Sequence, residues 1–296
     1  MGEKRVHMLS VDVEDAVNQA MRNFFHSEME PTIRVYDNTM RLLDLFAEYR
    51  SRATFFILGE VAKKYPELIK NIAGQGHELG IHGYSHTRYT SLSREALREE
   101  IRMSKSLVEE ISGQAVVGHR APEFSIGRDN AWVLEILKDE GIEYDSSIFP
   151  VGLGRYGWPG FINEIGWFPL NDGRKIIEVP LTTCRMLGKQ VPVGGGGYLR
   201  MFPFALTNHA FKKIQDQRPV NVYLHPYEID PPPFQDFYME AISKSSLKSR
   251  LKLKTYWLNR YTVMPKLLKL LKTYSFDTLQ NVIRANMDGF VQDDVQ

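Results

Sequence analysis

The chain has 296 residues, of which 43% are hydrophobic, 11% aromatic and 25% charged, and its 37 basic and 36 acidic residues give a formal net charge of +1. These values are ordinary for a globular protein and exclude collagen, a coiled-coil rod and a wholly disordered chain. The near-balanced charge gives no reason to expect a nucleic-acid-binding protein.

Strands and helices alternate along the first half of the sequence. The apolar run VHMLSVDV predicts a buried strand over 6–13, and apolar residues at helical spacing predict a helix over 39–49. The following elements are expected as strands over 53–58, 77–82, 116–119 and from 144, and as helices over 61–73, 94–111 and 130–140. This alternation, with short glycine-containing links, predicts an α/β fold with a largely parallel sheet.

The pattern changes over residues 151–197, which are rich in aromatic residues, proline and glycine and include four consecutive glycines, Gly194 to Gly197. The alternation then resumes with a predicted helix over 207–215 and a strand over 220–224, before three consecutive prolines at 231–233. At this length the chain could form two domains or one α/β barrel.

The sequence also bears on the compartment. A single cysteine, Cys184, excludes an intrachain disulfide and a zinc site made of several cysteines. The N-terminus has no apolar core of a signal peptide, and no window approaches the roughly 18 apolar residues of a membrane span. We therefore expect a soluble, cytoplasmic chain.

Two polar motifs follow predicted strands. His82 and His86 form an H-x-x-x-H motif, whose spacing allows both imidazoles to bind one metal ion where the chain turns, although two unrelated surface histidines would read the same. Asp12, Glu14 and Asp15 lie at the end of the first strand, where strand alternation puts Asp12 and Glu14 on one face. Two histidines and one carboxylate would leave a position open for water, as in catalytic metal sites.

Three further polar groups stand at predicted strand ends. Arg120 precedes a proline that could aim it inward toward a carboxylate, Asp145 ends the next strand, and His225 follows the strand over 220–224. Each alone could be structural. Because the carboxyl ends of parallel strands meet at one edge, where α/β sites assemble, their combination predicts an active site.

These motifs resemble those of the polysaccharide deacetylases, the carbohydrate esterase type with a NodB homology domain. The matching segments, in order over about residues 6–230, are LSVDVED, GHELGIHGYSHTRYTSLS, GHRAPEFSI, YDSSIFP and VYLHP. The resemblance implies a distorted (β/α) barrel over 1–235, with a glycine- and aromatic-rich loop insertion and a helical C-terminal extension over 236–296. PVGGGGYLRMFP before LHPYEIDP is similar to a subgroup found in exopolysaccharide and surface-glycan loci.

The resemblance assigns roles to matching positions. Asp12 would be the general base, Arg120 would orient it, and His225 would assist as general acid. His82 and His86 would bind a divalent metal together with Glu14 or Asp15, and the metal that the resemblance implies is zinc. Many relatives have two adjacent aspartates where this chain reads Asp-Val-Glu-Asp, so both carboxylates stay open, with alternation favouring Glu14.

The reaction implied is hydrolysis of an N-acetyl group on an amino sugar of a bacterial surface or extracellular polysaccharide or its precursor, with release of acetate. Tyr223 stands where an aliphatic residue often lines the acetyl pocket. We expect Tyr223, the adjacent Leu224 and Asp145 of the fourth motif to contact the substrate. The loop over 151–198 could shape a glycan groove, with Trp158 and Tyr198 stacking on sugars, or be a packed loop.

The C-terminal segment is strongly basic. Between Ala241 and Phe276 it has nine basic residues and no acidic one: Lys244, Lys248, Arg250, Lys252, Lys254, Arg260, Lys266, Lys269 and Lys272. Its MPKLLKLLKTY stretch predicts a basic amphipathic helix, which could lie on an anionic membrane surface or pack its leucines on the barrel.

Two other functions fit the same motifs. The fold and metal could serve a non-sugar amide such as a ureide ring or a formamide, or the chain could be an inactive glycan-binding module. The intact Asp12, His82 and His86 argue against the inactive module. No nucleic-acid partner is expected, and the oligomeric state is not indicated.

Overall fold

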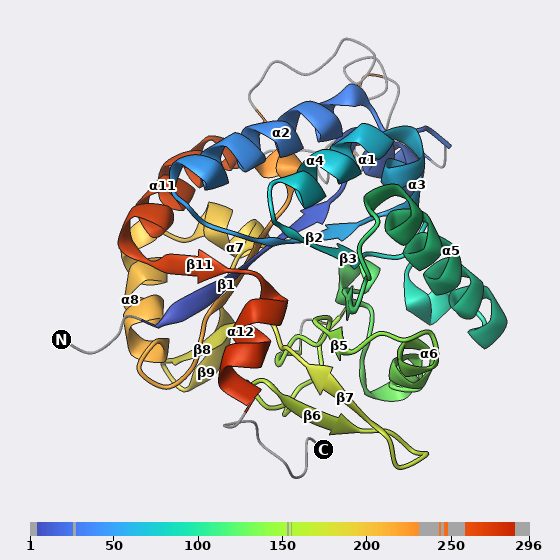
Figure 1. The fold of residues 1–296 in the computed structure, drawn as a ribbon. Helices are drawn as coiled ribbons and strands as arrows, with labels where there is room; N and C mark the ends of the chain where they lie inside the picture. Colours follow the sequence, from blue (N-terminus) through green and yellow to red (C-terminus); the bar gives the residue numbers. More distant parts are fainter. Residues whose placement is uncertain are drawn as a thin grey trace.

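The structure is a computed structural model, and it describes residues 5–25, 28–152, 154, 156–230, 243, 246–247 and 258–287. Within these residues, nine strands form one twisted sheet in the order β10-β1-β2-β3-β4-β5-β7-β6, with β11 also paired to β1 (Figure 1). The pairs are parallel except β6 with β7. The strands are β1 (Val6–Val13), β2 (Thr54–Ile57), β3 (Glu78–Ile81), β4 (Gly118–His119), β5 (Tyr144–Asp145), β6 (Gly166–Pro169), β7 (Lys175–Glu178), β10 (Asn221–Leu224) and β11 (Ser275–Asp277).

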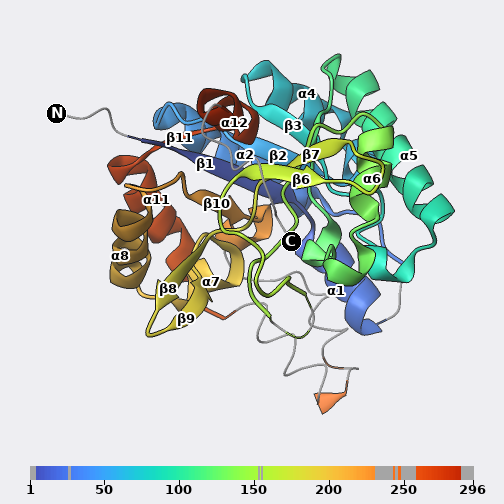
Figure 2. The same cartoon turned by 90° about the horizontal axis from the view of Figure 1, so that it is seen from below.

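Helices surround the sheet, as expected when parallel strands are buried on both faces (Figures 1 and 2). Those between β1 and β5 are α1 (Ala16–Phe25), α2 (Ile33–Glu48), α3 (Gly59–Lys64), α4 (Pro66–Gly74), α5 (Arg94–Ser112) and α6 (Val133–Asp139). Three helices from later in the sequence lie on the opposite side of the sheet from α5 and α6 (Figure 2): α7 (Gly196–Met201), α8 (Phe204–Ile214) and α11 (Val263–Thr273). The predicted α/β fold of the distorted-barrel type is confirmed.

The strand β1 lies at the centre of this arrangement. It pairs with β10 from Met8 to Val11, with β2 from Ser10 to Val13, and with β11 from Val6 to Met8. Seven of its eight residues are buried. β1 is therefore paired with β2, the next strand in the sequence, and with β10 and β11, which follow more than 200 residues later.

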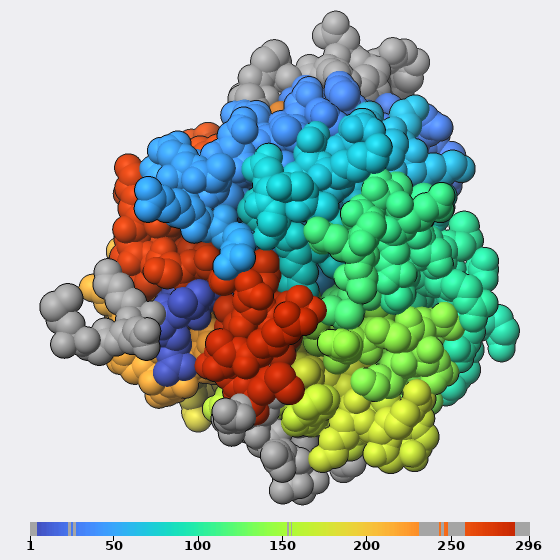
Figure 3. Space-filling view, in the orientation of Figure 1, coloured from blue at the N-terminus to red at the C-terminus, as the bar shows by residue number. Residues whose placement is uncertain are grey.

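The C-terminal elements pack into this body. Helix α12 (Leu279–Asn286) buries Leu279, Val282 and Ile283 in a cluster with residues of β1, β2, β5 and β7. Helix α11 buries Leu267, Leu270 and Leu271 in the main core. Figure 3 shows the red C-terminal residues between the blue and green parts of one continuous surface.

The amphipathic α11 thus uses its leucines for packing. Lys244, Lys248, Arg250, Lys252 and Lys254 and the boundary predicted near residue 235 lie outside the described residues. Peripheral membrane contact through the basic segment stays a prediction. No helix in the described part of the chain is long and apolar enough to cross a bilayer.

The structure differs from the predicted elements in four places. Within the extension predicted to be helical, β11 is a strand that joins the main sheet. Helix α1 was not predicted, and Pro66 divides the predicted helix over 61–73 into α3 and α4. The segment over 151–197, predicted as an irregular loop, contains the β6–β7 pair and a separate hairpin of β8 (Thr183–Met186) and β9 (Lys189–Pro192). Alternation is weak in these four-residue strands, which is why the sequence did not reveal them.

Candidate active site

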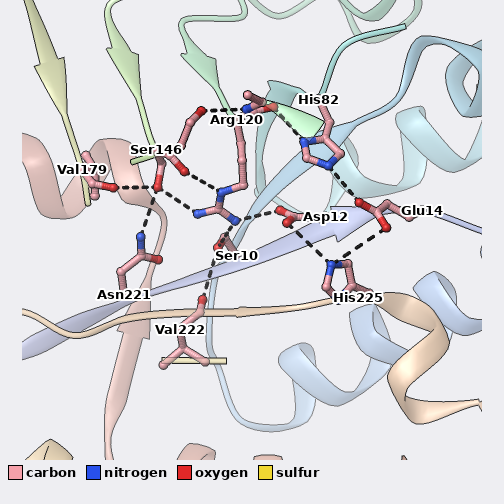
Figure 4. A network of polar contacts seen from close by, with 12 residues as sticks. Ser10, Asp12, Glu14, His82, Arg120, Ser146, Val179, Asn221, Val222 and His225 are labelled. Carbon is pink, nitrogen blue, oxygen red and sulfur yellow. Dashed lines mark hydrogen bonds and ion pairs between the residues drawn. The ribbon is translucent and has the colours of Figure 1, made fainter. Parts of the chain in front are cut away.

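The polar groups predicted at the strand ends meet at one edge of the sheet. Asp12 and Glu14 stand at the end of β1, His82 follows β3, Arg120 follows β4, and His225 follows β10 (Figure 4). A cavity of about 240 Å³ opens at this edge. Its lining residues are Asp12, Glu14, Gln19, His82, His86, Glu123, Phe124, Tyr156, Tyr223, His225 and Tyr227.

One carboxylate oxygen faces both histidines of the H-x-x-x-H motif. Glu14 Oε1 lies 2.9 Å from His82 Nε2 and 2.9 Å from His86 Nε2. Burial would raise the pKa of Glu14, but the imidazoles of His86, His225 and His82 hold it well below its usual range. Burial likewise disfavours the charged form of His86, yet Glu14 raises its pKa. The three side chains form a cluster whose ligand atoms all lie within 4.8 Å of one another.

The donor set of this cluster fits a metal ion. His82 Nδ1 donates to the backbone carbonyl of Arg120 at 2.7 Å, so a neutral His82 turns the lone pair of Nε2 toward Glu14. A lone pair and a carboxylate repel each other unless a proton or a cation lies between them. Ligating histidines commonly donate their second ring N–H to a carbonyl in this way. Two imidazoles and one carboxylate match the ligands of a catalytic zinc site.

The turn that carries the histidines is held from outside. The Glu100 carboxylate of α5 accepts from the backbone N–H groups of Tyr84 and Ser85 at 2.7 and 3.2 Å and from the Ser85 hydroxyl. His86 itself has φ of 58°, a left-handed conformation that a non-glycine residue adopts at some cost. The surrounding contacts therefore impose the backbone geometry that turns His86 toward Glu14.

Arg120 lies beneath the cavity and is fully buried. Its Nη1 donates to Asp12 Oδ1 at 2.7 Å and to Ser10 Oγ, while Nε and Nη2 donate to the carbonyl and hydroxyl of Ser146 (Figure 4). Phe56 packs against the guanidinium, 4.3 Å from its central carbon. Asp12 is thus fixed through Oδ1, and its Oδ2 faces His225.

His225 stands across the cavity from the histidine cluster. Its Nε2 lies 3.9 Å from both Asp12 Oδ2 and Glu14 Oε2, and its Nδ1 lies 3.4 Å from Glu228 Oε2. Burial would lower the pKa of His225, but Glu14, Glu228 and Asp12 raise it to about 9. These carboxylates therefore favour the protonated form of the imidazole.

Glu14 and Asp15, the two carboxylates considered as metal ligands, have different surroundings. Asp15 turns away from the histidines, accepting from the backbone N–H of Val17 at 2.8 Å and from that of Thr32. These bonds tie the start of α1 to the residue before α2. Glu14, which shares the face of Asp12 as strand alternation predicted, is the carboxylate that meets His82 and His86.

Of three residues predicted to bind substrate, one lines the cavity and two are buried away from it. Tyr223 lines the cavity, and its ring packs edge-on against Phe124. Asp145 and Leu224, in contrast, are fully buried, so the expected direct contact of these two with substrate is corrected. Asp145 accepts from Ser147 and faces His119 Nδ1 at 2.6 Å, which makes it a buried partner of β4.

A larger cleft of about 820 Å³ adjoins the cavity, and Phe124 and Tyr156 line both. Trp158 is largely buried against Phe161 and Phe168 but contributes to the wall of this cleft. Tyr198 is absent from the lining of both hollows, and packs against Phe149 instead. Neither Phe124 nor Tyr156 was predicted as a site residue, although Phe124 lies within the GHRAPEFSI motif.

Three of the four consecutive glycines, Gly194 to Gly196, lie so close to other parts of the protein that a side chain would not fit. A Cβ on Gly195 would lie 1.9 Å from the carbonyl oxygen of Tyr223, and φ at Gly195 is +155°. A Cβ on Gly194 would lie 2.3 Å from the carbonyl oxygen of Asn221. Only glycine allows this segment to lie against β10, directly beneath the cavity.

Two family models match consecutive parts of the chain. Residues 31–144 match the model described as polysaccharide deacetylase, and residues 146–284 match one described as a domain of unknown function, DUF3473. The first match contains His82, His86 and Arg120. Asp12 and Glu14 precede it, while Tyr223 and His225 lie in the second. The cavity is therefore assembled from both regions and from the strand before them.

Curated relatives share the first region. A peptidoglycan-N-acetylglucosamine deacetylase of Bacillus cereus is 34% identical over 84 residues, 28% of this chain and 30% of the relative. A peptidoglycan deacetylase of Helicobacter pylori is 30% identical over 135 residues, 46% of this chain and 42% of the relative. A chitooligosaccharide deacetylase of Rhizobium leguminosarum is 33% identical over 99 residues, 33% and 43% of the two chains. The chain spans less than half the length of these relatives.

Solved structures share the fold over nearly the whole chain. A Mycobacterium smegmatis protein assigned to the polysaccharide deacetylases superposes with a TM-score of 0.61 at 16% identity, covering 100% of this chain and 96% of the other. The allantoinase Puue gives a TM-score of 0.62 at 15% identity, covering 95% and 90%. The chain therefore matches the polysaccharide deacetylase model over 31–144 and the DUF3473 model over 146–284, and the two solved structures share its fold.

Proposed function

We propose that the chain is a metal-dependent hydrolase that removes N-acetyl groups from amino-sugar units of a bacterial surface or extracellular polysaccharide, or of its precursor. The observation that carries the proposal is the meeting of three groups at one strand edge: the Glu14–His82–His86 cluster, the Arg120-bound Asp12, and His225. The named activities of the relatives support the same chemistry.

The metal would be held by His82, His86 and Glu14, and we propose zinc because of this ligand set. A divalent cation bound there would polarise the amide carbonyl and make water a better nucleophile near neutral pH. Glu14 is suited to ligation because its low pKa keeps it ionised.

Asp12 is placed to act as general base. Its Oδ1 is occupied by Arg120, which leaves Oδ2 facing the cavity as the oxygen that accepts the proton of the attacking water. Arg120 is a positioning residue, because its four hydrogen bonds fix the carboxylate from below and its charge offsets that of Asp12.

His225 is placed to protonate the leaving amine. Its Nε2 faces the cavity from the side opposite the histidine cluster and carries the proton that the sugar nitrogen needs when the C–N bond breaks. The 3.9 Å separation from Asp12 and Glu14 leaves the Nε2–H free of a close partner among these two carboxylates, so it can be directed to the substrate.

The adjoining cleft supports an oligomeric glycan as substrate. Its volume of about 820 Å³ lies in the ~300–1,000 Å³ range of ligand sites, and it continues from the cavity across Phe124 and Tyr156. The partly exposed Tyr156 and the half-buried Trp132, whose ring has the Arg94 guanidinium over one face, give this path apolar surface for sugar rings. Because an allantoinase has the same fold, small non-sugar amides are the competing class of substrate.

The test is acetate release from N-acetylglucosamine oligomers of increasing length, with allantoin and formamides assayed in parallel. We expect activity that rises with oligomer length, loses at least about 100-fold in Asp12→Asn, and requires a metal that His82→Ala no longer retains. Asp216→Asn and His209→Ala, which change exposed residues outside the cavity, are the matched controls. Turnover of only the non-sugar amides, or full activity in Asp12→Asn, would contradict the proposal.

A further inference from the structure

The imidazole of His225 is contacted by two side chains of the segment that follows it. The Tyr227 ring stacks on it, with centroids 4.7 Å apart and planes inclined by 11°. The Glu228 carboxylate, which is buried, accepts from the His225 backbone N–H at 3.1 Å and lies 3.4 Å from Nδ1. Both residues belong to the short 3-10 helix η4 (Pro226–Ile229). The position of His225 therefore depends on how η4 is held.

Residues from the C-terminal part of the chain contact Tyr227. Arg260, in the 3-10 helix η5 (Arg260–Thr262), places its guanidinium carbon 4.7 Å from the centroid of the Tyr227 ring. Only 5% of Arg260 is exposed, although it is an arginine. A desolvated guanidinium is attracted to an aromatic ring more strongly than one exposed to water. Arg260 thus forms the outer layer of contacts around His225, with Tyr227 between them.

Glu228 is held from the same direction. Arg200 of α7 lies with Nε 3.3 Å from Glu228 Oε1. The end of α7 is in turn bound by the C-terminal segment, because Lys266 donates to the carbonyls of Leu199 and Arg200 at 2.8 and 3.1 Å, and Thr262 donates to the Arg200 carbonyl at 3.2 Å. Cations close to the final carbonyls of a helix satisfy acceptors that lack intrahelical partners.

The helix behind these contacts is fixed by the core. Helix α11, which follows η5 directly, buries Val263, Leu267, Leu270 and Leu271. A charged side chain on a rigid, buried support can hold a reacting group in place, whereas one on an exposed loop cannot do so accurately.

We infer that the C-terminal segment over 258–273 is part of the catalytic apparatus: Arg260, through Tyr227, and Lys266, through Arg200 and Glu228, set the position of the His225 imidazole. The inference rests on the proposed function, in which His225 protonates the leaving amine. Arg260 is a positioning residue, since Tyr227 separates it from the imidazole. The DUF3473 region then supplies both the proton donor and its supports.

Arg260→Met tests the inference, since methionine fills the buried space without the charge. We expect kcat to fall about 10-fold to 100-fold, because ~1 Å of misplacement can cost about 100-fold, with KM and bound metal little changed. Arg260→Lys keeps a cation over the Tyr227 ring and should recover most of the lost kcat. Arg218→Met is the matched control, because Arg218 lies before β10, at the opposite end of the strand from His225.

A second readout does not depend on catalysis. In the metal-free, full-length protein, the ring-proton resonance of His225, assigned with His225→Gln, reports its stacking on Tyr227. Tyr227→Leu gives the shift for complete loss of stacking, and we expect Arg260→Met to move the resonance in the same direction. Arg218→Met should leave it in place.

The outcomes separate the inference from the proposed function. If the wild type releases no acetate from any glycan, the proposed function fails, while the His225 resonance still decides whether the segment positions the ring. The inference is overturned if Arg260→Met leaves the resonance unmoved, or lowers kcat no more than Arg218→Met at equal loss of melting temperature. Should Arg260→Met not fold, Arg260→Lys and Tyr227→Leu carry the same comparison.

Discussion

Arg120 and Asp12 form a fully buried ion pair whose coupling can be measured. The exposed fractions of the two side chains are 0% and 2%, and Nη1 and Oδ1 are 2.7 Å apart. The perturbation is a double-mutant cycle of Arg120→Met, Asp12→Asn and the double variant. Methionine removes the charge and four donated hydrogen bonds, while asparagine removes the partner charge at constant shape.

The magnitude follows from what each variant leaves behind. Arg120→Met leaves the Asp12 carboxylate buried beside acceptors that have lost their donor, and breaking a buried pair by removing one partner costs about 3–5 kcal/mol. In the double variant the uncompensated charge is gone. We therefore expect the double variant to lose about 1.5–3 kcal/mol less free energy of unfolding than the two single variants lose in total. This difference is the contribution of a hydrogen bond to a charged group.

The assay is urea unfolding at pH 7 in the presence of a chelator, so that metal binding does not contribute to the free energy of unfolding. At a slope of about 1–3 kcal/mol/M, a coupling of ~2 kcal/mol corresponds to a midpoint shift of roughly 0.7–2 M. Additivity of the two single effects within about 0.5 kcal/mol would refute the idea that Arg120 is present mainly to hold Asp12.

Three further predictions concern the cluster, the glycine run and a buried histidine. Glu14→Gln should weaken zinc binding at least about 10-fold by metal titration, while Asp15→Asn changes it less than twofold. Gly195→Ala should lower the melting temperature far more than Gly173→Ala, because only the first Cβ meets the β10 backbone; equal losses would contradict the packing argument. Burial lowers the pKa of His77 to about 4, so its stabilising contribution is present above pH 6.5 and is lost toward pH 4. His77→Gln should lose less stability than the wild type between these values in urea unfolding; an unchanged pH dependence would contradict this.

Much of the site could be predicted because strand geometry is local. Once a run such as VHMLSVDV is taken as a parallel strand, its period of two puts Asp12 and Glu14 on one face, and its carboxyl end marks the edge where His82 and His225 must also stand. The structure has all four side chains at one cavity. The same alternation favours Glu14 over Asp15, whose side chain instead caps a helix that the sequence did not reveal.

The supports of the site could not be predicted, because they depend on tertiary packing between distant segments. Arg260 and Tyr227 are 33 positions apart, and neither belongs to a motif that indicates a contact. Tyr156 and Trp158 lie in one aromatic stretch, yet Tyr156 lines the cavity and Trp158 packs into the core. Composition marks such a stretch as unusual but does not say which ring is buried.

The central position of β1 has a consequence for how the chain folds. Residues 6–13 are synthesised first, but their partners in β10 and β11 follow only after residues 221–224 and 275–277 have been made. Long-range parallel pairing of this kind forms late and slowly, because the closure of a long loop must precede the contacts that stabilise it. The nascent N-terminal half therefore exposes the edge of β1 that β10 and β11 later cover, and we expect early folding intermediates to bind chaperones. A shortened chain that ends after the deacetylase match would keep that edge open permanently, so aggregation rather than a smaller working enzyme is the expected product.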